Sequence, residues 1–342
     1  MYLKTLFIKL IYVTAIITYL SACNNNQTQK GAGQTRLDTL PITNESVKNI
    51  STQIESEPEN AESYYQRAVI YYTEKYLDRS LMDITDALKY DSKNPLYFYF
   101  KGRILYSMNK TQDAANAYES AIVLKPDYTE AQLKLAELYY VVKEHQKSIN
   151  LLNVILVAEP TNANAYYLKG DNQRESNDTA KAIASYQKAL EIDDKFYDAA
   201  MQLGLIMTAK KNPIGKEYFT TAIRINPRSA EAYFGRAFFY QQIGELQKSL
   251  FDYRKVITID PTNDKSYYNV GMINFNAKQY AEALRSWDIC IQMNTENMEA
   301  YYMRGLVHEY KRNKTDALLN YEYALKLNPN YELAKEGIER LK

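Results

Sequence analysis

The sequence predicts an all-α protein in which helical hairpins stack into a solenoid, and three observations lead to this prediction. Similar residues recur with a period of 34 from Ala61 onward, a length typical of helical-hairpin repeats. The 342 residues include only 11 glycines and 9 prolines, which is few for a chain of short strands and turns. Hydrophobic residues make up 46% and charged residues 24%, as in ordinary folded proteins.

Each repeat carries small and bulky residues at fixed positions, which we count from its first residue. In the repeat 95–128, Phe98, Gly102 and Leu105 occupy positions 4, 8 and 11. Steps of four and three residues place them on one face of a first helix. Positions 20, 24 and 27 form the same pattern on a second helix, with Tyr118 at position 24. Because one hairpin cannot bury its own apolar faces, the hairpins are expected to stack.

This pattern resembles the tetratricopeptide repeat (TPR). The resemblance implies a TPR helical-hairpin solenoid, a right-handed superhelix of eight repeats plus end helices. It also implies that Gly170 and Gly305, at position 8, are packing glycines. The predicted repeats span residues 61–94, 95–128, 129–162, 163–196, 197–229, 230–263, 264–297 and 298–331.

Two features depart from the TPR pattern. The repeat 197–229 is one residue short, and we expect Asn212 to cap its second helix and Pro213 to be the first helical residue. This irregularity is either a tolerated turn variant or a flexible hinge between two four-repeat halves of the array. Position 7, aliphatic in the family, is polar in five repeats. The residues concerned are Arg67, Lys101, Lys169, Arg236 and Arg304.

Residues 1–22 are predicted to be a lipoprotein signal peptide. They carry Lys4 and Lys9, continue with an uncharged stretch over residues 10–20 and end in small residues. With the cysteine that follows, the sequence resembles the bacterial lipobox, and the resemblance implies cleavage before Cys23 and acylation of this residue. Two alternatives stay open: an ordinary cleaved signal with a chance cysteine, and an uncleaved helical anchor.

The remaining segments flank the predicted repeats. Residues 23–45, polar and without periodicity, are expected to form a flexible tether behind the lipidated cysteine. Residues 46–60 are expected to form an N-terminal capping helix, and residues 332–342 a C-terminal solvating helix. Because Asn24 is not an aspartate, the lipobox resemblance favours the outer membrane of a bacterial cell envelope.

The 33 tyrosines divide between core and candidate binding positions. Tyrosines at positions 4, 11 and 24 are predicted to be core residues. In the TPR family, positions 2, 5, 9, 12 and 13 of the first helix line a concave groove, and here aromatic residues hold position 5 in six of eight repeats. Polar residues interrupt this aromatic row and either orient a partner or neutralise one another. The candidate partner-binding residues are Tyr65, Tyr72, Tyr99, Tyr106, Tyr140, Tyr167, Phe234, Phe238, Tyr268, Phe275, Tyr302 and Tyr310, with Arg103, Glu137, Asp171 and Arg174.

These features predict a membrane-anchored scaffold or adaptor that binds a protein or peptide in the TPR groove. The alternative is a glycan- or nutrient-binding envelope lipoprotein, because tyrosine rows also stack on sugars. A formal net charge of +1 gives no electrostatic footprint for nucleic acid. We find no nucleophile motif, metal-ligand spacing or phosphate loop, so we predict no enzymatic activity, cofactor or metal. Cys290, at position 27, is expected to be a buried structural thiol.

One known use of a TPR groove does not fit the sequence. TPR co-chaperones bind an acidic carboxyl terminus with lysine at position 5 and asparagine at position 9. In this chain, position 5 is never lysine and position 9 is never asparagine. The sequence therefore predicts a different kind of partner segment.

Overall fold

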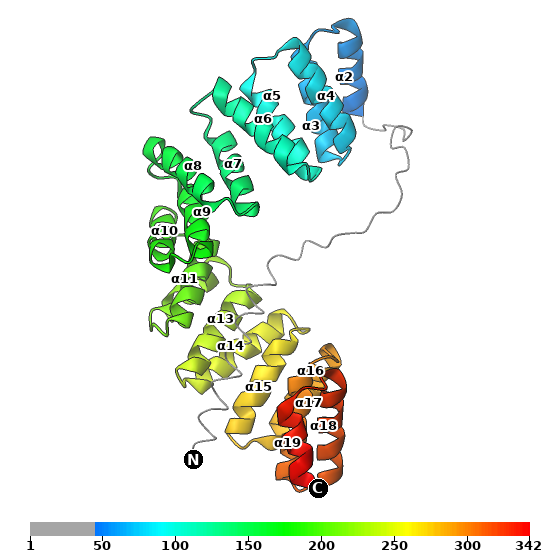
Figure 1. Ribbon diagram of the computed structural model, residues 1–342, viewed down its shortest axis with the longest axis vertical. Helices are drawn as coiled ribbons and strands as arrows, with labels where there is room; N and C mark the ends of the chain where they lie inside the picture. Colours follow the sequence, from blue (N-terminus) through cyan, green and yellow to red (C-terminus); the bar gives the residue numbers. More distant parts are fainter. Residues whose placement is uncertain (1–44) are drawn as a thin grey trace. The chain divides into compact units, whose positions relative to one another are not determined.

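The computed structural model describes residues 45–342, and this range contains helices and no strand (Figure 1). The signal peptide, the lipidated Cys23 and nearly all of the predicted tether lie outside the described residues. The helices are α2 (Glu45–Ser56), α3 (Ala61–Thr73), α4 (Leu77–Tyr90), α5 (Pro95–Ser107), α6 (Thr111–Leu124), α7 (Thr129–Val141), α8 (His145–Ala158), α9 (Ala163–Glu175), α10 (Thr179–Ile192), α11 (Tyr197–Ala209), α12 (Gly215–Ile225), α13 (Ala230–Gln242), α14 (Leu246–Ile259), α15 (Asp264–Asn276), α16 (Tyr280–Met293), α17 (Met298–Tyr310), α18 (Lys314–Leu327) and α19 (Glu332–Leu341).

The chain divides into two units, Met1–Glu59 and Asn60–Lys342. The described part of the first unit holds α2 alone. In the second unit, each helix packs against the helices before and after it in the sequence, beginning with the hairpin α3–α4 (Figure 1). Contacts that skip one helix join α7 to α9, α11 to α13 and α17 to α19. Such purely local packing is that of a helical-hairpin solenoid, which confirms the predicted fold class.

Glycine at position 8 allows the two helices of a hairpin to approach around an aromatic ring at position 24. A β-carbon built on Gly102 would lie 2.5 Å from the Tyr118 ring, closer than real contacts allow. In the α7–α8 hairpin, where Leu152 replaces the ring, alanine takes the place of the glycine at Ala136. In the α13–α14 hairpin, alanine at Ala237 packs in one core cluster with the buried Tyr253 ring, so a ring at position 24 does not always require glycine at position 8. The close pairs are Gly102–Tyr118, Gly170–Tyr186, Gly204–Phe219, Gly271–Trp287 and Gly305–Tyr321.

Each hairpin turns through a residue in the left-handed region at position 15. Only one of these residues is glycine, Gly244, with φ of 80°. The others accept the less favourable conformation because it lets the chain reverse within three residues, or five at residues 210–214. They are Lys75, Asn109, Lys143, Asn177, Lys211, Lys278 and Arg312.

The three arginines at position 7 form ion pairs or hydrogen bonds inside the solenoid. Arg236 donates to both carboxylate oxygens of Asp252, at 2.7 and 2.9 Å, and Asp252 is only 1% exposed. Arg67 binds Asp83 in the same way, at 2.8 Å for both bonds. Arg304 donates to Asn320 and reaches Asp288 of the preceding hairpin. Arginine at position 7 therefore joins the two helices of its hairpin, through a bidentate ion pair in the first two cases.

The turn of the α11–α12 hairpin differs from the expectation. Helix α12 begins at Gly215, so Pro213 lies before the helix rather than at its first position. Asn212 does accept a hydrogen bond from the backbone N–H of Ile214, at 3.1 Å. The turn, residues 210–214, is longer than those of the other hairpins, and α12 is shorter, with 11 residues where α10 and α14 have 14. The core continues through this hairpin, because the buried Phe219 ring packs against both Gly204 and Gly235.

Candidate functional site

The candidate site is built on aromatic residues at position 5, and in four hairpins this ring is supported by the ring at position 24. Tyr167 illustrates the arrangement: its ring centroid lies 5.6 Å from that of Tyr186, at position 24 of the same hairpin. Such pairs stabilise the fold beyond the area that they bury. The equivalent pairs are Tyr99–Tyr118 at 6.0 Å, Phe234–Tyr253 at 5.4 Å and Tyr302–Tyr321 at 5.6 Å. Position 5 therefore has a packing role that the sequence did not reveal.

Three of the position-5 tyrosines contact a further ring from the residue just before the next helix. Tyr99 packs on Tyr128 at 5.3 Å, and Tyr167 stacks on Phe196 at 5.1 Å. Tyr302 contacts Tyr331 edge-on at 5.6 Å. At other hairpins the residue in this place is asparagine or serine, whose side chain caps the following helix. The capping residues are Asn60, Asn94, Asn162, Ser229, Asn263 and Asn297.

This second set of rings was not predicted from the sequence. The set consists of Tyr128, Phe196 and Tyr331, which make no side-chain capping hydrogen bond. The helices that follow them therefore begin with an aromatic contact in place of a side-chain cap. The signal was present in the sequence: an aromatic residue stands where the other repeats have asparagine or serine. Its meaning depends on the helix-to-helix distance, which the sequence does not contain.

The candidate aromatic residues differ in their exposure to solvent. Tyr302 is only 3% exposed, whereas Tyr106 and Tyr310 are 46% and 61% exposed. Tyr302 therefore offers almost no surface to a partner, and its inclusion among the contact residues is corrected: it belongs to the core. The half-buried candidates are Tyr65, Tyr72, Tyr99, Tyr140, Tyr167, Phe234, Phe238, Tyr268 and Phe275.

The exposed Tyr310 belongs to a group of three rings. Its ring stacks on Tyr280 with an interplanar angle of 11° and a centroid distance of 6.0 Å. Phe275 packs against both rings, at 5.7 Å from each. Helices α15, α16 and α17 each contribute one member. Tyr280, which lies outside the predicted groove positions, was not expected at this place.

The four polar candidates fall into separate environments. The Arg103 guanidinium lies over the Tyr72 ring at 5.1 Å and over Phe100 at 5.6 Å. Glu137 is exposed and pairs with Lys134 on its own helix, at 2.6 Å. Glu137 is thus paired within its own helix, whereas the Arg103 guanidinium lies on ring faces, which do not neutralise its charge.

Asp171 and Arg174 lie on one turn of α9 and face the aromatic pair of their hairpin. Asp171, 8% exposed, accepts a hydrogen bond of 2.7 Å from the Tyr186 hydroxyl. Burial raises the pKa of Asp171 to about 6, although the Tyr186 hydroxyl and Arg174 act in the opposite direction. Arg174 pairs with Glu175 at 2.9 Å. Asp171 is therefore a buried structural carboxylate, and its inclusion as a direct partner contact is corrected.

The same hydroxyl contact recurs in two other hairpins. Tyr253 donates to Gln241 at 2.8 Å, and Tyr321 donates to Glu309 at 2.5 Å. Glu309 is also held by Arg340 of α19, through two bonds of 2.9 and 3.0 Å. Acceptors at predicted groove positions thus satisfy the buried tyrosine hydroxyls, as burial of a polar group requires.

Metal binding finds no support in the part of the chain that the structure describes. Between residues 45 and 342, no three His, Cys, Asp or Glu side chains gather in a way that could hold a metal ion. Cys290, 0% exposed, is packed in the core of the α15–α16 region. Nor is any helix between residues 45 and 342 both long and apolar enough to span a bilayer.

Family models match much of the chain. Residues 47–196 match the TPR domain of cytochrome c-type biogenesis protein H. Residues 218–251, 252–285 and 298–331 match tetratricopeptide repeat models. Among curated proteins, the Hsp70-Hsp90 organizing protein 1 of Glycine max is 27% identical over 214 residues. The match covers 59% of this chain and 36% of that protein, so the chain spans about a third of this relative's length.

Solved structures share the fold. The C-terminal part of a TPR repeat-containing protein from Cytophaga hutchinsonii matches 70% of this chain and 99% of its own, with a TM-score of 0.62 and 17% identity. A tetratricopeptide repeat protein from Parabacteroides merdae matches 72% of this chain and 98% of its own, with a TM-score of 0.51 and 17% identity. Identities this low establish a common architecture and nothing about partners.

Proposed function

We propose that this chain, which contains tetratricopeptide repeats, is a scaffold that binds a protein or peptide along the aromatic residues of its first helices. One observation carries the proposal: rings such as Tyr99 and Tyr167 are half-buried and held between other rings. A partner that contacts such a ring gains apolar area, and little side-chain entropy is lost because the ring is already fixed.

The composition of the proposed surface changes along the array. Helices α5, α7 and α9 carry charged groups at groove positions, such as Arg103 and Glu137. Helices α11, α13 and α15 carry uncharged groups at position 9, namely Leu205, Phe238 and Met272, all half-buried. The partner segment should therefore be apolar where it meets α11, α13 and α15 and polar where it meets α5, α7 and α9.

The relatives support an interaction scaffold in general terms. The name of the Glycine max protein states that it organizes Hsp70 and Hsp90, which are proteins. The lysine and asparagine that such co-chaperones use at positions 5 and 9 are replaced here, for example by Tyr99 and Arg103. We therefore propose a partner segment that binds through aromatic and apolar contacts, without a charged terminus.

Truncation of the two most exposed candidate rings tests the groove. Tyr106→Ala and Tyr310→Ala, combined, should reduce partner recovery from an envelope extract by about tenfold or more, because interface energy concentrates in a few aromatic anchors. The matched control is Phe251→Ala on α14, where a ring of similar size is 59% exposed at position 22 of a second helix. The proposal fails if the control loses the partner as strongly as the double variant, or if the double variant retains it fully.

We also propose that the protein is anchored to the outer membrane of a bacterial cell envelope through acyl chains on Cys23. The support is the basic, apolar and small-residue order of residues 1–22 before the cysteine. Several buried acyl chains hold a protein firmly, since each methylene contributes about 0.8 kcal/mol. Cys23→Ser should leave the protein unprocessed or released in fractionation, and normal processing of this variant would remove the anchor proposal.

One observation favours the alternative of a glycan-binding function. The exposed Tyr310 ring is backed by a parallel Tyr280 ring, and a flat, fixed aromatic face is suited to stacking on a sugar. Binding to a glycan array that is lost in Tyr310→Ala, without recovery of any protein partner, would support this alternative over the scaffold.

A further inference from the structure

The position-4 rings of two hairpins are covered by a tyrosine of the chain itself. Tyr64 on α3 is stacked by Tyr90 on α4, with 5.6 Å between centroids and 22° between planes. Tyr301 on α17 is stacked by Tyr323 on α18, at 5.4 Å and 18°. Tyr90 comes from position 30 and Tyr323 from position 26, so two positions of a second helix can supply the covering ring.

An arginine at position 7 covers the same rings from another direction. Arg67 lies 5.9 Å above the Tyr64 ring, and Arg304 lies 5.4 Å above the Tyr301 ring. Each of these position-4 rings is thus enclosed by a parallel ring and a cation, both of which stabilise contacts with an aromatic face.

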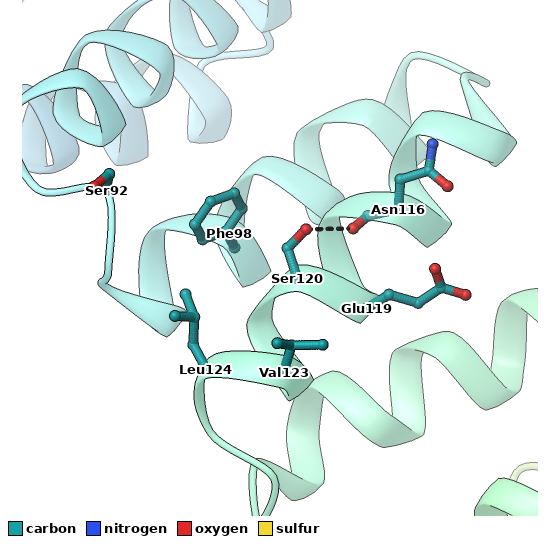
Figure 2. A pocket seen from close by; sticks show the side chains of 7 residues that line it. All are labelled: Ser92, Phe98, Asn116, Glu119, Ser120, Val123 and Leu124. Atoms are coloured by element: carbon teal, nitrogen blue, oxygen red, sulfur yellow. Dashed lines mark hydrogen bonds between the residues drawn. The ribbon is translucent and has the colours of Figure 1, made fainter.

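Three position-4 rings within residues 45–342 have neither cover: Tyr166, Tyr267 and, in the α5–α6 hairpin, Phe98, which borders a cleft. Phe98 is the ring, and the covering positions 7, 26 and 30 hold Lys101, Ser120 and Leu124. Among the described residues, no ring stacks on Phe98 and no cation lies over it. An open cleft of about 520 Å³ occupies this place, and Figure 2 shows Phe98 between Ser92 and the α6 side chains.

The walls of this cleft combine apolar and polar side chains. Val123 is 79% exposed and Leu124 38% exposed, both at the end of α6. The polar residues that line it are Ser92, Asn116, Glu119 and Ser120. The Ser120 hydroxyl donates to the Asn116 backbone carbonyl at 2.8 Å (Figure 2), and Glu119 accepts a hydrogen bond from Tyr139 at 3.0 Å. The cleft therefore offers the face of a ring and two aliphatic side chains, beside polar groups that have partners within the chain.

We infer that this cleft is a docking slot for a tyrosine side chain of a partner protein, which takes the place that Tyr90 and Tyr323 hold in the other hairpins. The partner ring stacks on Phe98 and covers Leu124. Because the cleft is open, the phenol hydroxyl stays in water and needs no partner in the protein. The slot is built from position-4 and second-helix residues, so it is separate from the groove of the proposed function.

The probe for this slot is p-cresol, the analogue of a tyrosine side chain, titrated into the full chain by ligand-observed NMR. Wild-type protein should show saturable binding. Leu124→Tyr copies the arrangement of Tyr90, and Ser120→Tyr copies that of Tyr323. Each should fill the slot from within and weaken p-cresol binding by about tenfold or more. Two variants are used so that a folding failure in one, seen by circular dichroism, leaves the other informative.

Matched changes in the α17–α18 hairpin complete the experiment. Leu327→Tyr places a tyrosine at position 30 where Tyr323 already covers the ring, so p-cresol binding should not change. Tyr323→Ser copies Ser120 and should create a second equivalent of binding. Absence of saturable binding, or full binding in both filled variants, overturns the inference. A wild-type dimer that Leu124→Tyr converts to a monomer also overturns it, because a second copy of the chain is then the occupant.

Discussion

The ring of Tyr186 packs so closely on Gly170 that a β-carbon built on the glycine would lie 2.7 Å from the tyrosine Cδ1 atom. No ordinary carbon–carbon contact is this short, so either the ring or the helix must move when a side chain is added. The tyrosine hydroxyl is held by Asp171 at 2.7 Å, which restricts the movement of the ring. The close approach of α9 and α10 therefore depends on Gly170, on the Tyr186 ring and on the buried Asp171 together.

Gly170→Ala should destabilise the protein by about 1–3 kcal/mol, as overpacking of a well-packed core does. Urea denaturation measures the change through its midpoint. Tyr186→Leu should relieve the clash, because the α7–α8 hairpin combines alanine at Ala136 with Leu152. The two substitutions together should cost less than the sum of each alone. Simple additivity would show that the glycine and the ring are not in direct contact.

Asp171 should make the stability depend on pH in an unusual direction. Burial raises its pKa to about 6 in the folded protein, above its ordinary value of 3.8. The folded state therefore binds the proton more tightly than the unfolded state. The contribution of Asp171 to the stability of the folded state is therefore fully present below about pH 4 and is lost as the pH rises through about 6.

Asp171→Asn keeps an acceptor for Tyr186 and removes the charge, so it isolates this effect. The variant should equal the wild type near pH 4 and exceed it by about 1–3 kcal/mol near pH 7. Chemical denaturation of both proteins at the two pH values provides the comparison. A constant difference between the proteins across this range would mean that Asp171 is ionised at its ordinary pKa.

Arg236→Leu should be strongly destabilising, because it leaves the buried carboxylate of Asp252 without its bidentate partner. Loss of one member of a buried pair costs about 3–5 kcal/mol. The double variant Arg236→Leu and Asp252→Leu should recover much of this loss, since an apolar pair packs without an unpaired charge.

The chain itself provides the model for that double variant. In the α7–α8 hairpin the same two positions are Leu135 and Leu151. Thermal or urea unfolding of the wild type, of Arg236→Leu and of the double variant compares their stabilities. If the double variant is no more stable than Arg236→Leu, the pair has a role beyond compensating one buried charge.

Cys290 should be unreactive in the folded protein. Its side chain is 0% exposed, and burial raises the pKa of the thiol to about 12, so almost no thiolate is present near neutral pH. A thiol reagent added to the Cys23→Ser variant should label Cys290 only after denaturant is added. Rapid labelling of the native variant would place Cys290 outside the core.

Much of the candidate site could be inferred from residue positions, and the rest depended on distances between helices. The rows of aromatic residues could be predicted because equivalent positions recur along the chain with a period of 34 residues. The burial of Tyr302 could not be inferred, because it arises from Tyr321 on α18 and from Tyr331 just before α19. Tyr310, eight residues further along α17, is 61% exposed although both residues were assigned to one surface.

The sequence by itself determined the helices and their pairing. Helix formation and hairpin packing depend on steps of three and four residues, and these are local in the chain. Only the tertiary structure decided which aromatic side chains pack against other rings in the core and which are exposed to solvent. That distinction depends on what a neighbouring helix supplies: Tyr90 covers Tyr64, whereas Leu124 leaves Phe98 uncovered. The same residue type at the same repeat position therefore has different exposure, because packing partners come from other segments of the chain.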